Sequence, residues 1–213
     1  MKTVHGWAFP DADEFMAGQL KADGTYQGSH LEAALCHVTD WSLALDGGAH
    51  VGTWSRILAG RFDQVLAFEP SPDTYQALLA NMAAFGCANV VPVQAALGDR
   101  KGRVSMTLDG RGAQLKNTGA RYARPGGEIA QTTIDALALQ SLGFVKLDVE
   151  GSEHAALSGA LETLARCRPV VLFENKGLWR RFDVRPRGPH DLLAANGYKF
   201  LEKVGCDEIW GPA

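Results

Sequence analysis

Carboxylates close four apolar stretches of this sequence, and grouped carboxylates can take up protons, hold cations or accept hydrogen bonds from hydroxyl groups. These acids are Asp46, Glu69, Asp148 and Glu174, and Glu150 follows closely after the third. Short apolar runs of this kind are typical of buried strands. Parallel strands bring their carboxyl ends to one edge of a sheet, where buried acids are costly unless they bind something. The spacing therefore predicts a ligand site at that edge.

A glycine-rich turn follows the first of these acids. Gly47 and Gly48 come directly after Asp46, and a helix is expected to begin near Gly52. Glycine tolerates positive φ and lets the backbone approach a ligand closely. Glu69 closes the next strand at about the 20-residue offset expected of an acid that accepts hydrogen bonds from ribose hydroxyls. The two motifs together predict a site for an adenosine-containing ligand.

The charge and the glycine pattern of this turn argue against a dinucleotide. The Gly-x-Gly-x-x-Gly pattern needs glycine at position 49, where the chain has Ala49, and Asp46 would face the charge of a pyrophosphate. An acid here favours a cationic ligand, and S-adenosylmethionine carries an ammonium and a sulfonium group. We expect its adenine to lie near Ala96 and the rest of the molecule to contact six further residues: Asp46, Gly48, His50, Gly52, Glu69 and Asp148.

Composition limits the class of protein. The chain has 213 residues, of which 46% are hydrophobic, enough for one α/β domain with a full core. Its 21 basic and 24 acidic residues nearly balance, so no nucleic-acid partner is expected. A local basic group is expected to be a solvated loop; it comprises Arg180, Arg181, Arg185 and Arg187.

The cysteines and the chain start bear on location. Four cysteines are widely spaced without a metal-binding pattern, and we interpret them as reduced core thiols of a cytoplasmic protein; they are Cys36, Cys87, Cys167 and Cys206. The first residues lack an apolar signal core, and no apolar run approaches the roughly 20 residues of a membrane span. Secretion and membrane insertion are therefore disfavoured.

Apolar periodicity and turn residues predict the order of the elements. Strands are expected at 43–46, 65–69, 90–95, 144–149, 169–174, 198–201 and 206–210. Helices are expected at 11–21, 29–38 with a capping box from Ser29 to Glu32, 72–85, from 153 with an apolar face that includes Leu161, and 189–195. We divide the chain into an N-terminal helical cap segment, 1–42, and a domain, 43–213.

Two segments are expected to cover the ligand. The cap segment offers Tyr26, Gln27 and His30 as lining residues, with ordinary packing as the alternative. Residues 98–128 are glycine-rich and polar and too long for a plain connection, which predicts a β-hairpin and a mobile lid. Gln114, Lys116 and Asn117 belong to this lid.

The assembled motifs resemble the FkbM family of S-adenosylmethionine-dependent methyltransferases. The matching stretches are residues 45–52, 67–70, 96–99 and, most specifically, 145–153, which reads Val-Lys-Leu-Asp-Val-Glu-Gly-Ser-Glu. Gly47 and His50 depart from the pattern, which usually has Val and Asn there, so the contact of His50 to the cofactor's methionine end is open. The resemblance implies a class I methyltransferase fold, a Rossmann-like three-layer sandwich with a seven-stranded, mostly parallel sheet whose last strand is antiparallel. It also implies methylation, mostly of a hydroxyl group, on a small molecule or glycan.

Methyl transfer suggests roles for the remaining acids. Asp148 is the first candidate for the general base or for orienting the acceptor, and it faces the transferable group. Lys146 either stabilises a developing alkoxide or pairs with Asp148, and Glu150 is the third catalytic candidate. Glu174, Lys176 and Trp179 are candidates for binding the substrate. Asp148, Glu150 and Glu174 form the alternative of a divalent metal site.

Two other functions remain open at this point. A nicotinamide-dependent oxidoreductase uses the same architecture, although the glycine pattern does not favour it. A non-catalytic module that binds S-adenosylmethionine would keep the pocket between Asp46 and Glu69 without chemistry at Asp148. Binding and turnover measurements separate the three.

Overall fold

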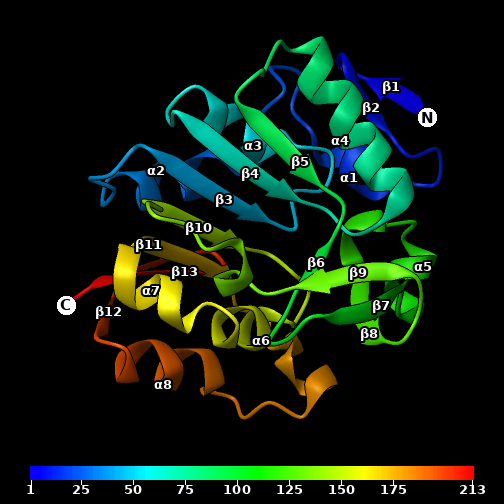
Figure 1. Ribbon diagram of the computed structural model, residues 1–213. Helices are drawn as coiled ribbons and strands as arrows, with labels where there is room; N and C mark the ends of the chain where they lie inside the picture. The colour runs from blue at the N-terminus through cyan, green and yellow to red at the C-terminus, as the bar shows by residue number, and fades with distance from the viewer.

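A seven-stranded sheet runs through the centre of the computed structural model, which describes residues 1–213 (Figure 1). Its order is β12-β13-β11-β10-β3-β4-β5. The strands are β3 (Leu43–Gly47), β4 (Gln64–Phe68), β5 (Val90–Val93), β10 (Phe144–Leu147), β11 (Val170–Glu174), β12 (Tyr198–Val204) and β13 (Asp207–Pro212). Neighbours from β11 to β5 are parallel, and β13 is antiparallel to both β11 and β12. The expected mostly parallel sheet with an antiparallel last strand is confirmed.

The central strands are buried on both faces. Every residue of β3, β10 and β11 is buried, which explains why their sequences read as nearly continuous apolar runs rather than as alternating ones. Lys146 in β10 interrupts the apolar pattern. A buried lysine in this position needs a partner, which the site provides.

Helices cover both faces of the sheet and make three layers (Figure 1). One face carries α2 (Gly28–Leu35), α3 (Thr53–Ala59) and α4 (Pro72–Ala84), together with α1 (Phe15–Gln19) and the hairpin of β1 (Lys2–Val4) and β2 (Trp7–Phe9). The other face carries α6 (Glu153–Ser158), α7 (Leu161–Cys167) and α8 (Gly188–Ala195). Leu31, Leu58 and Leu78 pack the first face, and Leu157, Leu164 and Leu193 pack the second.

A smaller four-stranded sheet lies beside the carboxyl ends of the central strands, at the right of Figure 1. Its order is β6 (Ala96–Leu97), β9 (Ile129–Thr132), β7 (Gly102–Thr107) and β8 (Tyr122–Pro125). The expected hairpin is confirmed, because β7 and β8 pair antiparallel. Between them lie α5 (Gly110–Gln114) and the 3-10 helix η1 (Thr118–Ala120), and we refer to residues 109–121 as the lid. Two further 3-10 helices are η2 (Asp135–Leu137) and η3 (Leu178–Phe182).

The N-terminal segment differs most from its prediction. Of the expected helix 11–21 only α1 forms, and the preceding β1–β2 hairpin was not expected, because strands of three residues carry little periodicity. The capping box is wrong: Ser29 lies inside α2, whose N-cap is Gln27 without a side-chain cap. Trp7 and Leu31 share one core cluster with β3, so residues 1–42 pack as part of the main core.

Two further expectations need correction. The helix after position 153 is broken at Gly159, where a Cβ would lie 2.1 Å from the carbonyl oxygen of Gly98, and Leu161 is exposed rather than on the apolar face. None of the four cysteines is a core thiol, since two are exposed and two are partly exposed.

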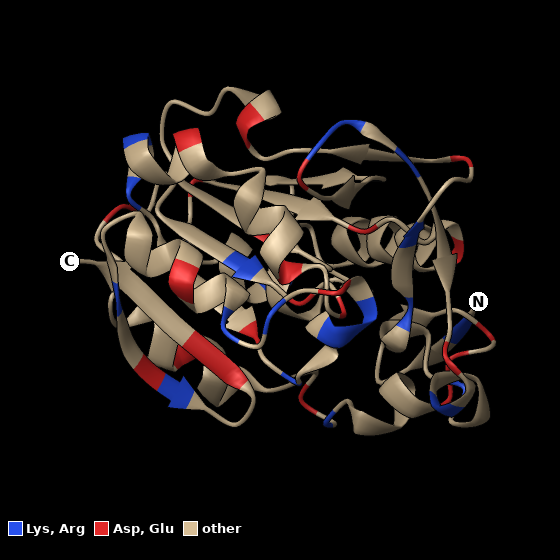
Figure 2. Ribbon diagram, turned by 90° about the horizontal axis from the view of Figure 1, so that it is seen from below, with Lys and Arg blue, Asp and Glu red and all other residues tan.

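No helix is both long and apolar enough to cross a membrane. Acidic and basic residues are distributed over the ribbon in Figure 2.

Candidate functional site

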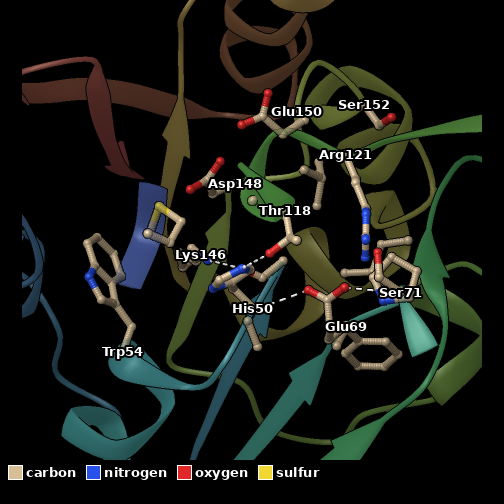
Figure 3. A pocket seen from close by; sticks show the side chains of 18 of the residues that line it. His50, Trp54, Glu69, Ser71, Thr118, Arg121, Lys146, Asp148, Glu150 and Ser152 are labelled. Carbon is tan, nitrogen blue, oxygen red and sulfur yellow. Dashed lines mark hydrogen bonds between the residues drawn. The ribbon is translucent and has the colours of Figure 1, made fainter. Parts of the chain in front are cut away.

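A cavity lies at the carboxyl ends of β3, β4 and β10, beneath the lid (Figure 3). Eight of the predicted site residues line it: Gly48, His50, Glu69, Ala96, Lys146, Asp148, Glu150 and Lys176. Four do not: Asp46, Gly52, Glu174 and Trp179. The cavity therefore lies at the predicted edge of the sheet, although four of the predicted residues do not line it.

The glycine turn requires its glycines for different reasons. Gly48 has φ +75°, and a Cβ there would lie 1.9 Å from the carbonyl oxygen of Asp148, so only glycine lets β3 pass so close to the end of β10. Gly52 has φ +92°, and a Cβ there would lie 2.6 Å from side-chain atoms of Leu78 and Met82. Gly52 thus permits α3 and α4 to pack and does not reach the cavity.

Glu69 is buried and held at both oxygens by the backbone. Its Oε2 accepts the N–H of His50 at 3.0 Å, and its Oε1 accepts the N–H of Ser71 at 2.8 Å. Burial raises the pKa of Glu69 above its ordinary value, although these hydrogen bonds oppose the shift. The carboxyl group therefore has a fixed orientation at the wall of the cavity.

Asp46 does not face the cavity, contrary to the prediction. β3 continues through Gly47, so Asp46 lies within the sheet and is fully buried. Ser55 Oγ donates to its Oδ2 at 2.6 Å, and Lys146 Nζ lies 2.9 Å from its Oδ1. The Asp46 carboxylate, which was expected to bind a cationic ligand, is paired with Lys146 instead.

Lys146 pairs with Asp46 across the β10–β3 register rather than with Asp148. Its Nζ also donates to the carbonyl oxygen of Gly48 at 2.7 Å. Burial lowers the pKa of Lys146, but attraction by Asp46 and Asp148 outweighs burial and leaves the pKa above its ordinary value. The charged side chain thus connects the glycine turn to β10.

His50 belongs to a buried network that the sequence analysis missed. Its backbone has φ +52°, and its Nε2 lies 2.9 Å from Thr118 Oγ1 and 3.1 Å from Asp13 Oδ2. Thr118 Oγ1 donates to Asp13 Oδ2 at 2.5 Å, and Asp13 is fully buried. Burial raises the pKa of Asp13, but the contacts to His50 and Thr118 outweigh it and lower the pKa. In Figure 3, His50 and Thr118 lie between Asp148 and Glu69.

Three carboxylates meet at the other end of the cavity. Oxygen atoms of Asp148, Glu150 and Glu174 lie within 4.8 Å of one another. Burial and the charge of Asp148 raise the pKa of Glu150 to about 7 and that of Glu174 to about 10. Glu174 does not line the cavity itself, because Lys176 covers it with its ammonium group 2.7 Å from Oε2.

Two positively charged side chains, Lys176 and Arg181, lie beside these acids. Lys176 Nζ lies 3.5 Å from Glu150 Oε1, and Arg181 Nη1 lies 3.6 Å from Glu150 Oε2. Arg181 also pairs with Asp109 of the lid, so it is not the solvated loop residue that was expected. Trp179 stays outside the cavity, where the guanidinium group of Arg180 lies 5.1 Å from its ring centroid.

Two of the three residues of the cap segment that were expected to line the cavity do so. Tyr26 and Gln27 line it, whereas the His30 Nδ1 atom lies 2.7 Å from Asp207 Oδ2. Asp207, at the start of β13, also lines the cavity and was not predicted. Burial and the neighbouring carboxylates raise the pKa of the Tyr26 hydroxyl to about 12.

A family model described as the methyltransferase FkbM domain matches residues 46–200 of this chain. The match includes the glycine turn, Glu69, the lid and the carboxylates of Asp148, Glu150 and Glu174. Asp13 and Tyr26 lie before it. A search of curated proteins finds no match.

Solved structures resemble the fold at low sequence identity. The methyltransferase FkbM of Methylobacillus flagellatus KT aligns with TM-score 0.55 and 15% identity over 96% of this chain and 48% of that chain. This chain thus spans about half the length of that protein. The precorrin-6y C5,15-methyltransferase of Geobacter metallireducens aligns with TM-score 0.53 and 13% identity, over 96% of this chain and 91% of that one. A putative methyltransferase of Streptococcus mutans, solved in complex with SAH, aligns with TM-score 0.50 and 10% identity over 86% and 94%.

Proposed function

Because the chain belongs to the FkbM family of S-adenosylmethionine-dependent methyltransferases, we propose that it methylates a hydroxyl group of a small molecule or sugar. The observation that carries the proposal is the distribution of acids in one cavity. Glu69 lines one end with a fixed carboxyl group, and the half-buried Asp148 lines the other, near Glu150 and the Lys176 that pairs with it. One end suits a ribose, and the other suits a proton transfer.

We place the cofactor along the glycine turn. Glu69 accepts hydrogen bonds from the ribose hydroxyls, the backbone at Gly48 lies against the methionine portion, and the adenine lies near Ala96. Residues 1–42 act as a cap, because Phe15 and Tyr26 line the same cavity. Lys146 positions the glycine turn through Gly48 and does not act on the acceptor, since its charge is committed to Asp46.

The chemistry follows from the position of Asp148. The acceptor oxygen attacks the methyl carbon in line with the sulfur; a C–O bond forms, the C–S bond breaks, and its electron pair stays on sulfur. The hydroxyl proton passes to the Asp148 carboxylate. Holding the three reacting atoms in line supplies several kcal/mol of the barrier reduction.

The test combines binding with turnover. Calorimetry with the full chain is expected to show binding of S-adenosylmethionine and no comparable binding of a nicotinamide dinucleotide. Transfer of a labelled methyl group to a panel of sugars, phenols and alcohols is expected to yield a labelled ether. Preference for the dinucleotide would indicate an oxidoreductase, and tight cofactor binding without transfer to any compound would indicate a non-catalytic module.

A further inference from the structure

The carboxylates of Asp148, Glu150 and Glu174 form a group of oxygen atoms with the chemistry of a divalent cation site. They come from the ends of β10 and β11, and one oxygen of each lies within 4.8 Å of the others. Hard divalent cations prefer such oxygen ligands. The structure, however, places a side-chain cation among them.

That cation is the ammonium group of Lys176, two residues beyond Glu174. Its Nζ lies 2.7 Å from Glu174 Oε2 and 3.5 Å from Glu150 Oε1, and it lines the cavity. Gly177 follows with φ +74°, so the chain turns sharply where the lysine folds back over β11. Arg181 approaches Glu150 from its other oxygen at 3.6 Å.

We propose that the Lys176 ammonium is the resident cation of this carboxylate group, and that it takes the position and the role that a divalent metal ion takes in other acid-lined sites. The inference rests on the proposed methyl transfer. An ammonium has three N–H donors. With contacts to Glu174 and Glu150, one donor remains for the oxygen of the methyl acceptor.

The proposal gives the acceptor hydroxyl two partners. Lys176 donates to its oxygen and favours the negative charge that develops there, while Asp148 takes the proton. A divalent metal ion bound to these carboxylates at about 2.0–2.6 Å would be repelled by the positive charge of Lys176. The same electrostatics predict that removing this charge turns the three carboxylates into a metal site.

The experiment uses Mn²⁺ alone as probe, with the full chain, in calorimetry and electron paramagnetic resonance. Lys176→Met removes the charge and keeps most of the side-chain length, and Lys176→Arg is the matched control that keeps the charge. Wild type and Lys176→Arg are expected to bind no stoichiometric Mn²⁺ at 100 μM, about the range of ordinary protein cation sites. Lys176→Met is expected to bind one Mn²⁺, and adding Glu174→Gln is expected to abolish it.

Turnover gives a second readout once an acceptor is known. Wild-type activity is expected to be unchanged by a chelator, whereas Lys176→Met is expected to lose at least about ten-fold and to recover part of it with Mn²⁺. One Mn²⁺ bound by the wild type and lost with Glu174→Gln would overturn the proposal. Folded Lys176→Met that binds no Mn²⁺, with Lys176→Gln giving the same result, would also overturn it. Calorimetry and electron paramagnetic resonance with Mn²⁺ do not depend on methyl transfer. A failure of this proposal can therefore be distinguished from a failure of the proposed function.

Discussion

The carboxyl groups at the two ends of the cavity have different surroundings. At the end proposed to hold the cofactor, which we call the cofactor end, Glu69 accepts two backbone N–H groups, and the buried Asp13 beside His50 accepts the Thr118 hydroxyl. At the end proposed to hold the methyl acceptor, which we call the acceptor end, the carboxyl groups of Glu150 and Glu174 lie near Asp148, and Lys176 and Arg181 offset their charge. Carboxylates at one sheet edge can therefore be fixed binding points or groups that exchange protons, depending on whether dipoles or other charges surround them.

Protonation follows this difference. The contacts to His50 and Thr118 hold the pKa of Asp13 below its ordinary value despite full burial. Burial and the charge of Asp148 raise the pKa of Glu150 to about 7. Burial also raises the pKa of Glu69, against the charge of His50 and the N–H groups that bind both of its oxygens. Changes at the acceptor end should thus alter chemistry, and changes at the cofactor end should alter affinity.

The largest effect is expected at Asp148. Asp148→Asn removes the proton acceptor and keeps the size of the side chain, so turnover should fall roughly 10²-fold or more, the range for losing a positioned base. S-adenosylmethionine affinity and the melting temperature should stay unchanged. Initial rates with labelled cofactor, beside calorimetry, measure both. An Asp148→Asn variant with full turnover would remove this residue from the mechanism.

The next effect concerns the cofactor end. Glu69→Gln removes the charge and keeps one oxygen, which can accept only one of the two backbone N–H groups, so cofactor binding should weaken by about 1–3 kcal/mol with a smaller loss of stability than in Glu69→Ala. Glu69→Ala should weaken binding as well and also lower stability, because the N–H groups of His50 and Ser71 lose their acceptor. Calorimetry and denaturant unfolding separate the two effects. Unchanged affinity in Glu69→Gln would place the ribose elsewhere.

A third effect concerns Glu153, the buried first residue of α6, and is measured through stability. Burial raises the pKa of Glu153 from 4.5 to about 7, although its Oε1 accepts the N–H groups of Val149 and Gly151. Between these pH values the folded state holds a proton that the unfolded state has lost, so stability falls as pH rises to about 7 and then levels off.

Glu153→Gln does not titrate and can still accept an N–H group. Its free energy of unfolding should match the wild type near pH 4.5 and exceed it by about 3 kcal/mol above pH 7.5. Urea unfolding across this pH range measures the difference. A variant that is less stable than the wild type at high pH would show that Glu153 is charged and stabilising in the folded protein.

The strands and the sheet edge could be predicted because they are local features of the sequence. Apolar runs ending in Asp148 and Glu69 marked both the elements and the site. The position of Asp46 could not be judged this way, because the partners that bury its carboxylate, Ser55 and Lys146, come from α3 and β10 and meet it only in the folded chain.

The missed residues share a different reason. Asp13 and Thr118 meet across 105 positions of sequence, and Arg181 reaches Glu150 from a loop. None of these segments has a period or a motif of its own, so only the tertiary fold brings them together. His50 was visible as a departure from the family pattern, and its partners were not.

The smallest effect concerns the lid, whose mobility stays a prediction. Thr118 Oγ1 connects the lid to Asp13 and His50, and Arg121 pairs with Asp73 at the start of α4. Thr118→Val keeps the shape and removes the hydroxyl, so the free energy of lid opening should fall by about 1 kcal/mol, which makes amide exchange in the lid roughly five times faster. Thr107→Val on β7 is the matched control. Hydrogen exchange without ligand should also be faster in the lid than in β10, because the lid has few buried side chains to hold it. Lid amides that exchange as slowly as those of β10, in both variants, would show that the lid is a rigid part of the cofactor end.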